Sequence, residues 1–337
     1  MHLSDVWMIA VALSLTLYIV LDGYDLGIGI LTLFERNTGR RREMHELVAW
    51  VWDGNESWLV LLALTLWAGV PLVTGTALPA LYILLFPMLW GLIGRGVALE
   101  LIDQHDGWHR LWGPVFSVGS LLVAFCQGAA FGGLVAGLPV HGSEFAGGPF
   151  TCLHHGYAVL TGLTAVVLYV LAGSAWLYLK TGGETQRRAA RSGRLAVLLL
   201  AAGTAAAWLL APVAGSLTLD PDTAARLPVW LAGACVLAAG LAFAFYSFQP
   251  RPRDARFERR PALAALAVYG GGLLVVGGLL YPTLVPPSVT VHSAASPHTT
   301  LLFLTIGVGI VIPVILAYQA FSYWVFRGKA TKEATSP

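Results

Sequence analysis

The sequence contains the stretch Leu21-Asp22-Gly23-Tyr24-Asp25-Leu26-Gly27-Ile28-Gly29, which places two carboxylates inside an apolar run that extends from about residue 6 to residue 34. A run of this length can cross a bilayer as a helix. An aspartate near the centre of a spanning helix costs roughly 2.5 to 3.5 kcal/mol, so both side chains must face protein or a cavity rather than lipid. The stretch therefore predicts a membrane helix that is packed inside protein.

The spacing within this stretch separates two helix faces. Asp22 and Asp25 are three residues apart, so they share one face and must meet the same neighbour or cavity. Gly23 and Gly27 form a G-x-x-x-G pair on a different face, which lets another helix backbone approach closely. Two interpretations of the carboxylates stay open: they are functional, as intramembrane acids usually are, or they are hydrogen-bonded packing residues.

The composition defines the class of protein. The chain is 57% hydrophobic and only 11% charged over 337 residues, which indicates an integral membrane protein. Its net charge of +2 is too small to suggest a nucleic-acid partner. Three scattered cysteines without C-x-x-C spacing favour neither a disulfide framework nor an iron–sulfur or zinc site. We expect no cleavable signal peptide, because the first apolar run is too long and Asp5 stands where a basic region would be expected.

Nine apolar runs are long enough to span a bilayer, which predicts an all-α integral membrane protein with nine transmembrane helices. The expected spans are residues 6–34, 48–73, 76–102, 113–138, 153–180, 195–218, 227–249, 261–285 and 299–326. Short connections join them, so we expect one polytopic membrane domain over residues 1–337 with a short cytoplasmic tail at 328–337.

The basic residues predict how these spans are oriented. Of the 20 lysines and arginines, 18 follow the first, third, fifth, seventh and ninth spans. Arg226 lies in a loop of the opposite side, and Arg95 lies within a span. Because basic loops stay in the cytoplasm, we expect a periplasmic N-terminus and a cytoplasmic C-terminus in a bacterial cytoplasmic (inner) membrane.

A second polar cluster, Trp52-Asp53-Gly54-Asn55-Glu56-Ser57-Trp58, opens the second span. Asp53 and Glu56 share a helix face, and the alternation of spans places both acidic clusters in the cytoplasmic half of the membrane. Arg95, between two glycines of the third span, lies at a similar depth. A buried arginine needs an anionic partner, so we expect it to contact one of these carboxylates. The pair either fixes helix packing or has a functional role.

Carboxylates beside an arginine suit proton handling. Burial raises the pKa of a carboxyl group and a nearby arginine lowers it, so a group of them can be tuned to exchange protons near neutrality.

The histidines bear on haem binding, since a membrane haem is usually held by axial His or Met from facing helices. All nine lie toward the ends of spans, and Met88 is the one deep methionine. We therefore expect no haem in this chain. His154 and His155, at the outer start of the fifth span, could serve as ligands or as surface or capping residues.

Taken together, these segments resemble subunit II of the cytochrome bd-type quinol oxidases, including the cyanide-insensitive branch. The resemblance covers nearly the whole chain and is carried by both acidic motifs, by Arg95 and by C-terminal segments, namely Tyr281-Pro282, Val291-His292-Ser293-Ala294-Ala295-Ser296 and Ile312-Pro313-Val314-Ile315. Two acidic motifs in successive spans are its most specific part.

The resemblance implies a haem-free subunit of nine spans, built as two four-helix bundles plus one peripheral helix. Its partner would be subunit I, which carries haems b and d; a small single-span subunit, lipid and a bound quinone are further expected partners. Such a complex oxidises quinol at the outer face and reduces oxygen to water with cytoplasmic protons. Asp22 and Asp53 would be proton-path residues, with Asp25, Asn55, Glu56 and Arg95 as neighbours.

One segment departs from the family pattern. The fifth span begins Thr151-Cys152-Leu153-His154-His155-Gly156-Tyr157, where the family usually has a Pro-Phe-containing segment. The sequence does not show whether this outer region contacts a quinone or another group. It also does not show whether the chain belongs to the cyanide-insensitive branch.

Two other functions fit the residues. A proton-coupled secondary transporter also needs buried carboxylates, but it would show inverted halves, whereas the acids here are concentrated in the first three spans. A purely structural scaffold subunit would keep the fold without the proton path.

Overall fold

The computed structural model describes residues 2–102, 104, 108–141, 144–211, 221–248, 255–286 and 289–325. Nine helices of 18 or more residues make up most of this part: α1 (Leu3–Thr32), α3 (Trp52–Gly69), α4 (Pro71–Leu101), α5 (His109–Val135), α6 (Tyr157–Lys180), α7 (Gly183–Leu210), α8 (Pro221–Ser247), α10 (Arg260–Leu280) and α12 (His298–Val325).

Short elements connect the long helices. They are the helices α2 (Thr38–Ala49), α9 (Ala255–Glu258) and α11 (Val291–Ala294), the 3₁₀ helix η1 (Thr151–Gly156), and two antiparallel strand pairs, β1 (Val140–His141) with β2 (Glu144–Phe145) and β3 (Thr283–Val285) with β4 (Val289–Thr290). Side chains set several boundaries: Asn37 caps α2 by accepting from the Arg40 backbone N–H at 3.0 Å, and Pro71 starts α4.

Seven of the long helices have the length and hydropathy to cross a membrane, which confirms an all-α, multi-pass membrane protein. In the described part of the chain, α3 and α8 fall outside that set. The first turns of α3 carry Asp53, Asn55 and Glu56, and the apolar part of α8 is the shorter segment Leu231–Ser247. The count of nine membrane spans therefore stays a prediction.

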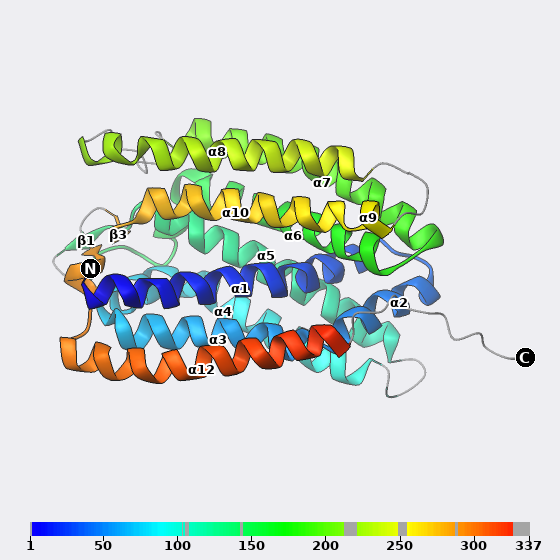
Figure 1. Cartoon of the computed structure of the whole chain (residues 1–337), viewed down its shortest axis with the longest axis horizontal. Coiled ribbons are helices and arrows are strands. Elements are labelled where there is room, and N and C mark those ends of the chain that lie inside the picture. Colours follow the sequence, from blue (N-terminus) through cyan, green and yellow to red (C-terminus); the bar gives the residue numbers. More distant parts are fainter. Residues whose placement is uncertain are drawn as a thin grey trace, which may run out of the picture.

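The long helices lie side by side along one axis, with α1 near the middle, α8 at one edge and α12 at the other (Figure 1). α1 packs against α3, α5 and α6, and α4 packs against α5. α6 packs against α7, and α8 packs against α10. α12 contacts α1 and α3 and leaves an apolar outer face exposed, including Phe303 and Ile310.

The segments that follow α1 and α6 meet at one end of the helix array, together with α9. Arg40 forms an ion pair with Glu35 at 2.8 Å, and Arg188 at the start of α7 lies 3.8 Å from the same carboxylate. Gln186 donates to Glu258 of α9 at 3.3 Å. α2 and α9 indeed lie at the same end in Figure 1. Basic segments far apart in sequence thus share one end; its cytoplasmic location stays a prediction.

The pair at this end predicts a pH dependence of stability. Hydrogen bonds from Arg40 lower the pKa of Glu35 from 4.5 to about 2, and the Glu35 side chain is 7% exposed. A lowered folded-state pKa means that Glu35 stabilises the protein above about pH 4.5 and that this contribution is lost as the pH falls toward 2. We expect the melting-temperature difference between wild type and Glu35→Gln to shrink across that window. A melting-temperature difference that does not change with pH would contradict the lowered pKa of Glu35.

Candidate functional site

A buried ion pair joins the first acidic motif to the third expected span. Arg95 Nη1 on α4 donates to Asp22 Oδ1 at 2.8 Å and to Oδ2 at 3.0 Å, and both side chains are fully buried. The arginine is held where α4 lies close to α5, since a Cβ on Gly119 would lie 2.8 Å from the Gly91 carbonyl oxygen. Charges at this depth are tolerated because each neutralises the other.

Glu56 is the second carboxylate beside Arg95. Its Oε1 lies 3.3 Å from Arg95 Nη1, and its side chain is 20% exposed while that of Arg95 is buried. One guanidinium therefore contacts carboxylates from α1 and α3. Of these acids, Glu56 is the one that reaches toward the surface.

Asp25 belongs to a hydrogen-bond network with uncharged side chains rather than to the ion pair. Its Oδ2 accepts from Asn55 Nδ2 at 2.7 Å. The Asn55 side chain also accepts from Gln319 Nε2 at 2.5 Å and from the Tyr323 hydroxyl at 3.1 Å, and the hydroxyls of Tyr24 and Tyr323 lie 2.6 Å apart. Asn55 thus links α1, α3 and α12.

Several buried atoms of the ion pair and of the Asn55 network have no hydrogen-bond partner among the residues that the structure describes. They are Asp25 Oδ1, Arg95 Nε and Nη2, and Gln319 Oε1. Buried polar groups normally form hydrogen bonds, and those without a protein partner are the usual binding sites of ordered water. The acidic cluster therefore keeps both donors and acceptors for additional bonds.

Asp53 stands apart from the buried acids. It is exposed in the first turn of α3, one turn before Glu56, where a negative charge also suits the helix N-terminus. The structure thus brings Asp22, Asp25, Asn55, Glu56 and Arg95 together and places Asp53 at their rim.

Gly23 and Gly27 lie where α1 meets α6 and α10. A Cβ on Gly27 would lie 1.8 Å from the Tyr169 carbonyl oxygen, and one on Gly173 would lie 2.5 Å from the Gly27 carbonyl carbon. A Cβ on Gly23 would lie 2.6 Å from the Tyr269 hydroxyl. The backbones of α1 and α6 are therefore in direct contact just beyond the two aspartates.

The sequence analysis did not single out Gln127, Tyr18 or Tyr169, which form a further hydrogen-bonded group. The Gln127 amide donates to the Tyr18 hydroxyl, and its oxygen accepts from the Tyr169 hydroxyl at 2.6 Å. Gln319 was missed as well. Both glutamines could have been found from the sequence, because each places an amide side chain inside an otherwise apolar span. Such a side chain is costly in a membrane unless it forms hydrogen bonds.

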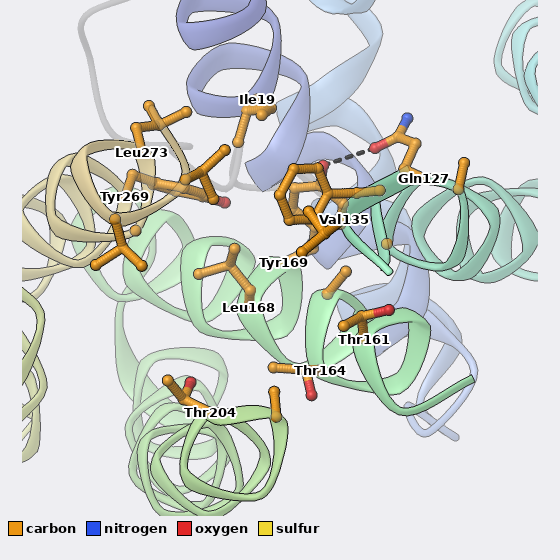
Figure 2. A pocket seen from close by; sticks show the side chains of 18 of the residues that line it. Ile19, Gln127, Val135, Thr161, Thr164, Leu168, Tyr169, Thr204, Tyr269 and Leu273 are labelled. Atoms are coloured by element: carbon orange, nitrogen blue, oxygen red, sulfur yellow. Dashed lines mark hydrogen bonds between the residues drawn. The ribbon is translucent and has the colours of Figure 1, made fainter. Parts of the chain in front are cut away.

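Tyr18, Gln127 and Tyr169 border a cavity of about 440 Å³ between the helices (Figure 2). Its lining is mostly apolar and comes largely from α1, α5, α6, α7 and α10. Gln127, Tyr169 and Tyr269 supply polar groups on its wall, and the buried Tyr269 hydroxyl has no hydrogen-bond partner in the described part of the chain.

Comparison with known proteins gives the family. The family described as cytochrome bd terminal oxidase subunit II matches residues 3–326. This chain belongs to the cytochrome bd terminal oxidase subunit II family. The resemblance inferred from the two acidic motifs and Arg95 is therefore confirmed.

Relatives of this subunit II chain match over nearly its whole length. It is 26% identical to cytochrome bd-I ubiquinol oxidase subunit 2 of Escherichia coli (strain K12), over 98% of this chain and 96% of that protein. It is 27% identical to cytochrome bd ubiquinol oxidase subunit 2 of Bacillus subtilis (strain 168), over 98% and 97%. A chain in the structure of bd oxidase from Geobacillus thermodenitrificans has the same fold, with a TM-score of 0.78, 15% identity and coverage of 97% and 99%.

Within the described residues of this subunit II chain, no group of three or more His, Cys, Asp or Glu side chains is arranged to hold a metal ion. The side chains of His154 and His155 lie outside the described part, so their role stays open. Met88 lines the cavity.

Proposed function

We propose that this chain is the haem-free subunit II of a bd-type terminal quinol oxidase, which couples quinol oxidation to the reduction of oxygen to water. It would stabilise the haem-bearing subunit I and provide a cytoplasm-facing proton path. The names of its full-length relatives support the complex and the partner. The helix contacts support one bundle of α1, α3, α4 and α5, a second of α6, α7, α8 and α10, and α12 at the periphery. A small single-span subunit is a further partner expected from the resemblance.

The observation that carries the proton path is the connection from an exposed acid to buried ones. Asp53 is exposed, Glu56 is partly exposed one turn later, and Asp22 and Asp25 are fully buried. Oxygen reduction consumes protons, and carboxyl groups within reach of one another, or of water between them, can pass protons along such a series.

The contacts suggest different roles for the buried acids. Both oxygens of Asp22 accept from Arg95, so this side chain is held in the buried ion pair. Among the described residues, Asp25 contacts no arginine and has one oxygen without a hydrogen-bond partner, and Glu56 reaches toward the surface. We therefore assign proton exchange mainly to Asp25 and Glu56, with the Asp22–Arg95 pair setting the electrostatic potential around them.

Haems b and d, which supply the redox chemistry when bound, would be held by subunit I. We assign the quinone that the resemblance implies to the cavity of this chain. The apolar walls suit an isoprenoid tail, and the Tyr269 hydroxyl, which has no partner among the described residues, can donate a hydrogen bond to a carbonyl oxygen.

Turnover per haem tests the proton path. Asp→Asn and Glu→Gln changes keep the shape of the side chain but remove its exchangeable proton. We expect Asp25→Asn, Asp53→Asn and Glu56→Gln to lower quinol oxidation at least roughly tenfold with normal haem content. Asp22→Asn should lower quinol oxidation as well, because it removes the charge that pairs with Arg95, and it should also lower the amount of assembled protein. Glu46→Gln, an exposed acid of α2, is the matched control and should be silent.

The alternatives give different outcomes in the same preparations. Wild-type turnover in all four variants would remove the proton path and leave a structural scaffold. A colourless chain that purifies without a second subunit would instead favour a proton-coupled transporter.

A further inference from the structure

The first three turns of α7 carry more positive charge than the described acidic residues around them neutralise. Residues 183–194 contain four arginines and one glutamate. Arg187 pairs with Glu184 at 2.9 Å, and Arg188 lies 3.4 Å from Glu184 and 3.8 Å from Glu35. In the part of the chain that the structure describes, Arg191 and Arg194 have no ion-pair partner.

These two arginines lie on the side of α7 that faces away from the protein. α7 packs on α6 and α8 through small and apolar residues, including Ala189, Gly193 and Val197. Arg191 is exposed and Arg194 is half-buried. They are three residues apart, so their guanidinium groups can reach one ligand from neighbouring positions on one face.

The following turn of α7 changes from charged to apolar. Leu195, Leu198 and Leu199 are 57%, 56% and 49% exposed, as expected of side chains in contact with lipid tails. Arg191 and Arg194 therefore stand at the boundary between the charged end and the apolar belt. Lipid phosphate groups occupy this depth in a bilayer.

We propose that Arg191 and Arg194 form a binding site for the phosphate of an anionic membrane phospholipid, whose acyl chains lie along Leu195, Leu198 and Leu199. Guanidinium groups bind phosphate through paired N–H donors, and a lipid satisfies both the unneutralised charge and the exposed apolar turn. This site is separate from the proposed proton path and does not depend on it.

Bound lipid can be counted directly. The protein, purified with the subunits that accompany it, is mixed with micelles containing phosphatidylglycerol or phosphatidylcholine, and retained lipid is measured by native mass spectrometry. We expect wild type to prefer phosphatidylglycerol. The double variant Arg191→Gln/Arg194→Gln should weaken that binding by roughly fivefold per arginine removed.

The matched control removes the same charge elsewhere. Two exposed arginines, Arg36 after α1 and Arg110 in the first turn of α5, are changed together to glutamine. We expect this variant to retain phosphatidylglycerol as wild type does. Equal losses of phosphatidylglycerol binding in the two double variants would show a general effect of surface charge and would overturn the proposed site. Undiminished phosphatidylglycerol binding in Arg191→Gln/Arg194→Gln, at the wild-type melting temperature, would overturn it as well.

Discussion

Replacement of Arg95 by methionine is expected to leave little assembled protein in the membrane. The change removes the cation that contacts Asp22, whose side chain is fully buried, and it also takes away the ion-pair partner that Glu56 has in the structure. Breaking a buried ion pair by removing one partner costs about 3–5 kcal/mol, a large part of the 5–15 kcal/mol by which native proteins are typically stable. The measurement is the amount of folded protein recovered in mild detergent, judged by size-exclusion chromatography.

Two variants separate the loss of charge balance from the loss of a large side chain. Arg42→Met removes an exposed arginine that pairs with Glu46, and exposed pairs contribute at most about 1 kcal/mol, so its yield should match wild type. Asp22→Leu combined with Arg95→Met removes both charges and should recover much of the assembly while turnover stays low. Wild-type yield for Arg95→Met alone would show that the pair does not stabilise the fold.

The sequence was sufficient to predict that Arg95 contacts a carboxylate of the first two spans, because the reasons are local and energetic. Intramembrane charges are rare and must be neutralised, so Arg95 and the acids of the first two spans had to be considered together. The same reasoning could not choose among Asp22, Asp25, Asp53 and Glu56, which differ in exposure only after the helices pack. The structure places Asp53 at the exposed rim and Asp25 against Asn55.

The contribution of α12 could not be read from its own sequence. Gln319 and Tyr323 bond to Asn55, 264 and 268 residues earlier in the chain, and nothing local to either residue indicates that contact. For the same reason, the sequence could not identify the helix that packs against the G-x-x-x-G pair. A glycine pair predicts a close neighbour, but only the fold shows that the neighbour is Gly173 of α6.

Addition of a single methyl group at Gly27 should separate α1 from α6. In Gly27→Ala the new Cβ would lie 1.8 Å from the Tyr169 carbonyl oxygen, so the backbones must move apart by roughly 1.5 Å or more to reach a normal contact. The opposing residue, Gly173, is already glycine and cannot shrink. Overpacking typically costs about 1–3 kcal/mol, and movement of α1 also carries Asp22 away from Arg95.

We therefore expect Gly27→Ala to lower both the yield of assembled protein and the turnover per haem, each by at least roughly tenfold. Gly75→Ala in α4 is the matched control, because a Cβ there would meet nothing within 4 Å. It adds the same methyl group to a membrane helix and should leave both quantities unchanged, since alanine also favours the helical backbone over glycine. Normal yield and turnover in Gly27→Ala would mean that α1 and α6 are not in backbone contact, and the position of the acidic cluster relative to Arg95 would then not depend on this glycine.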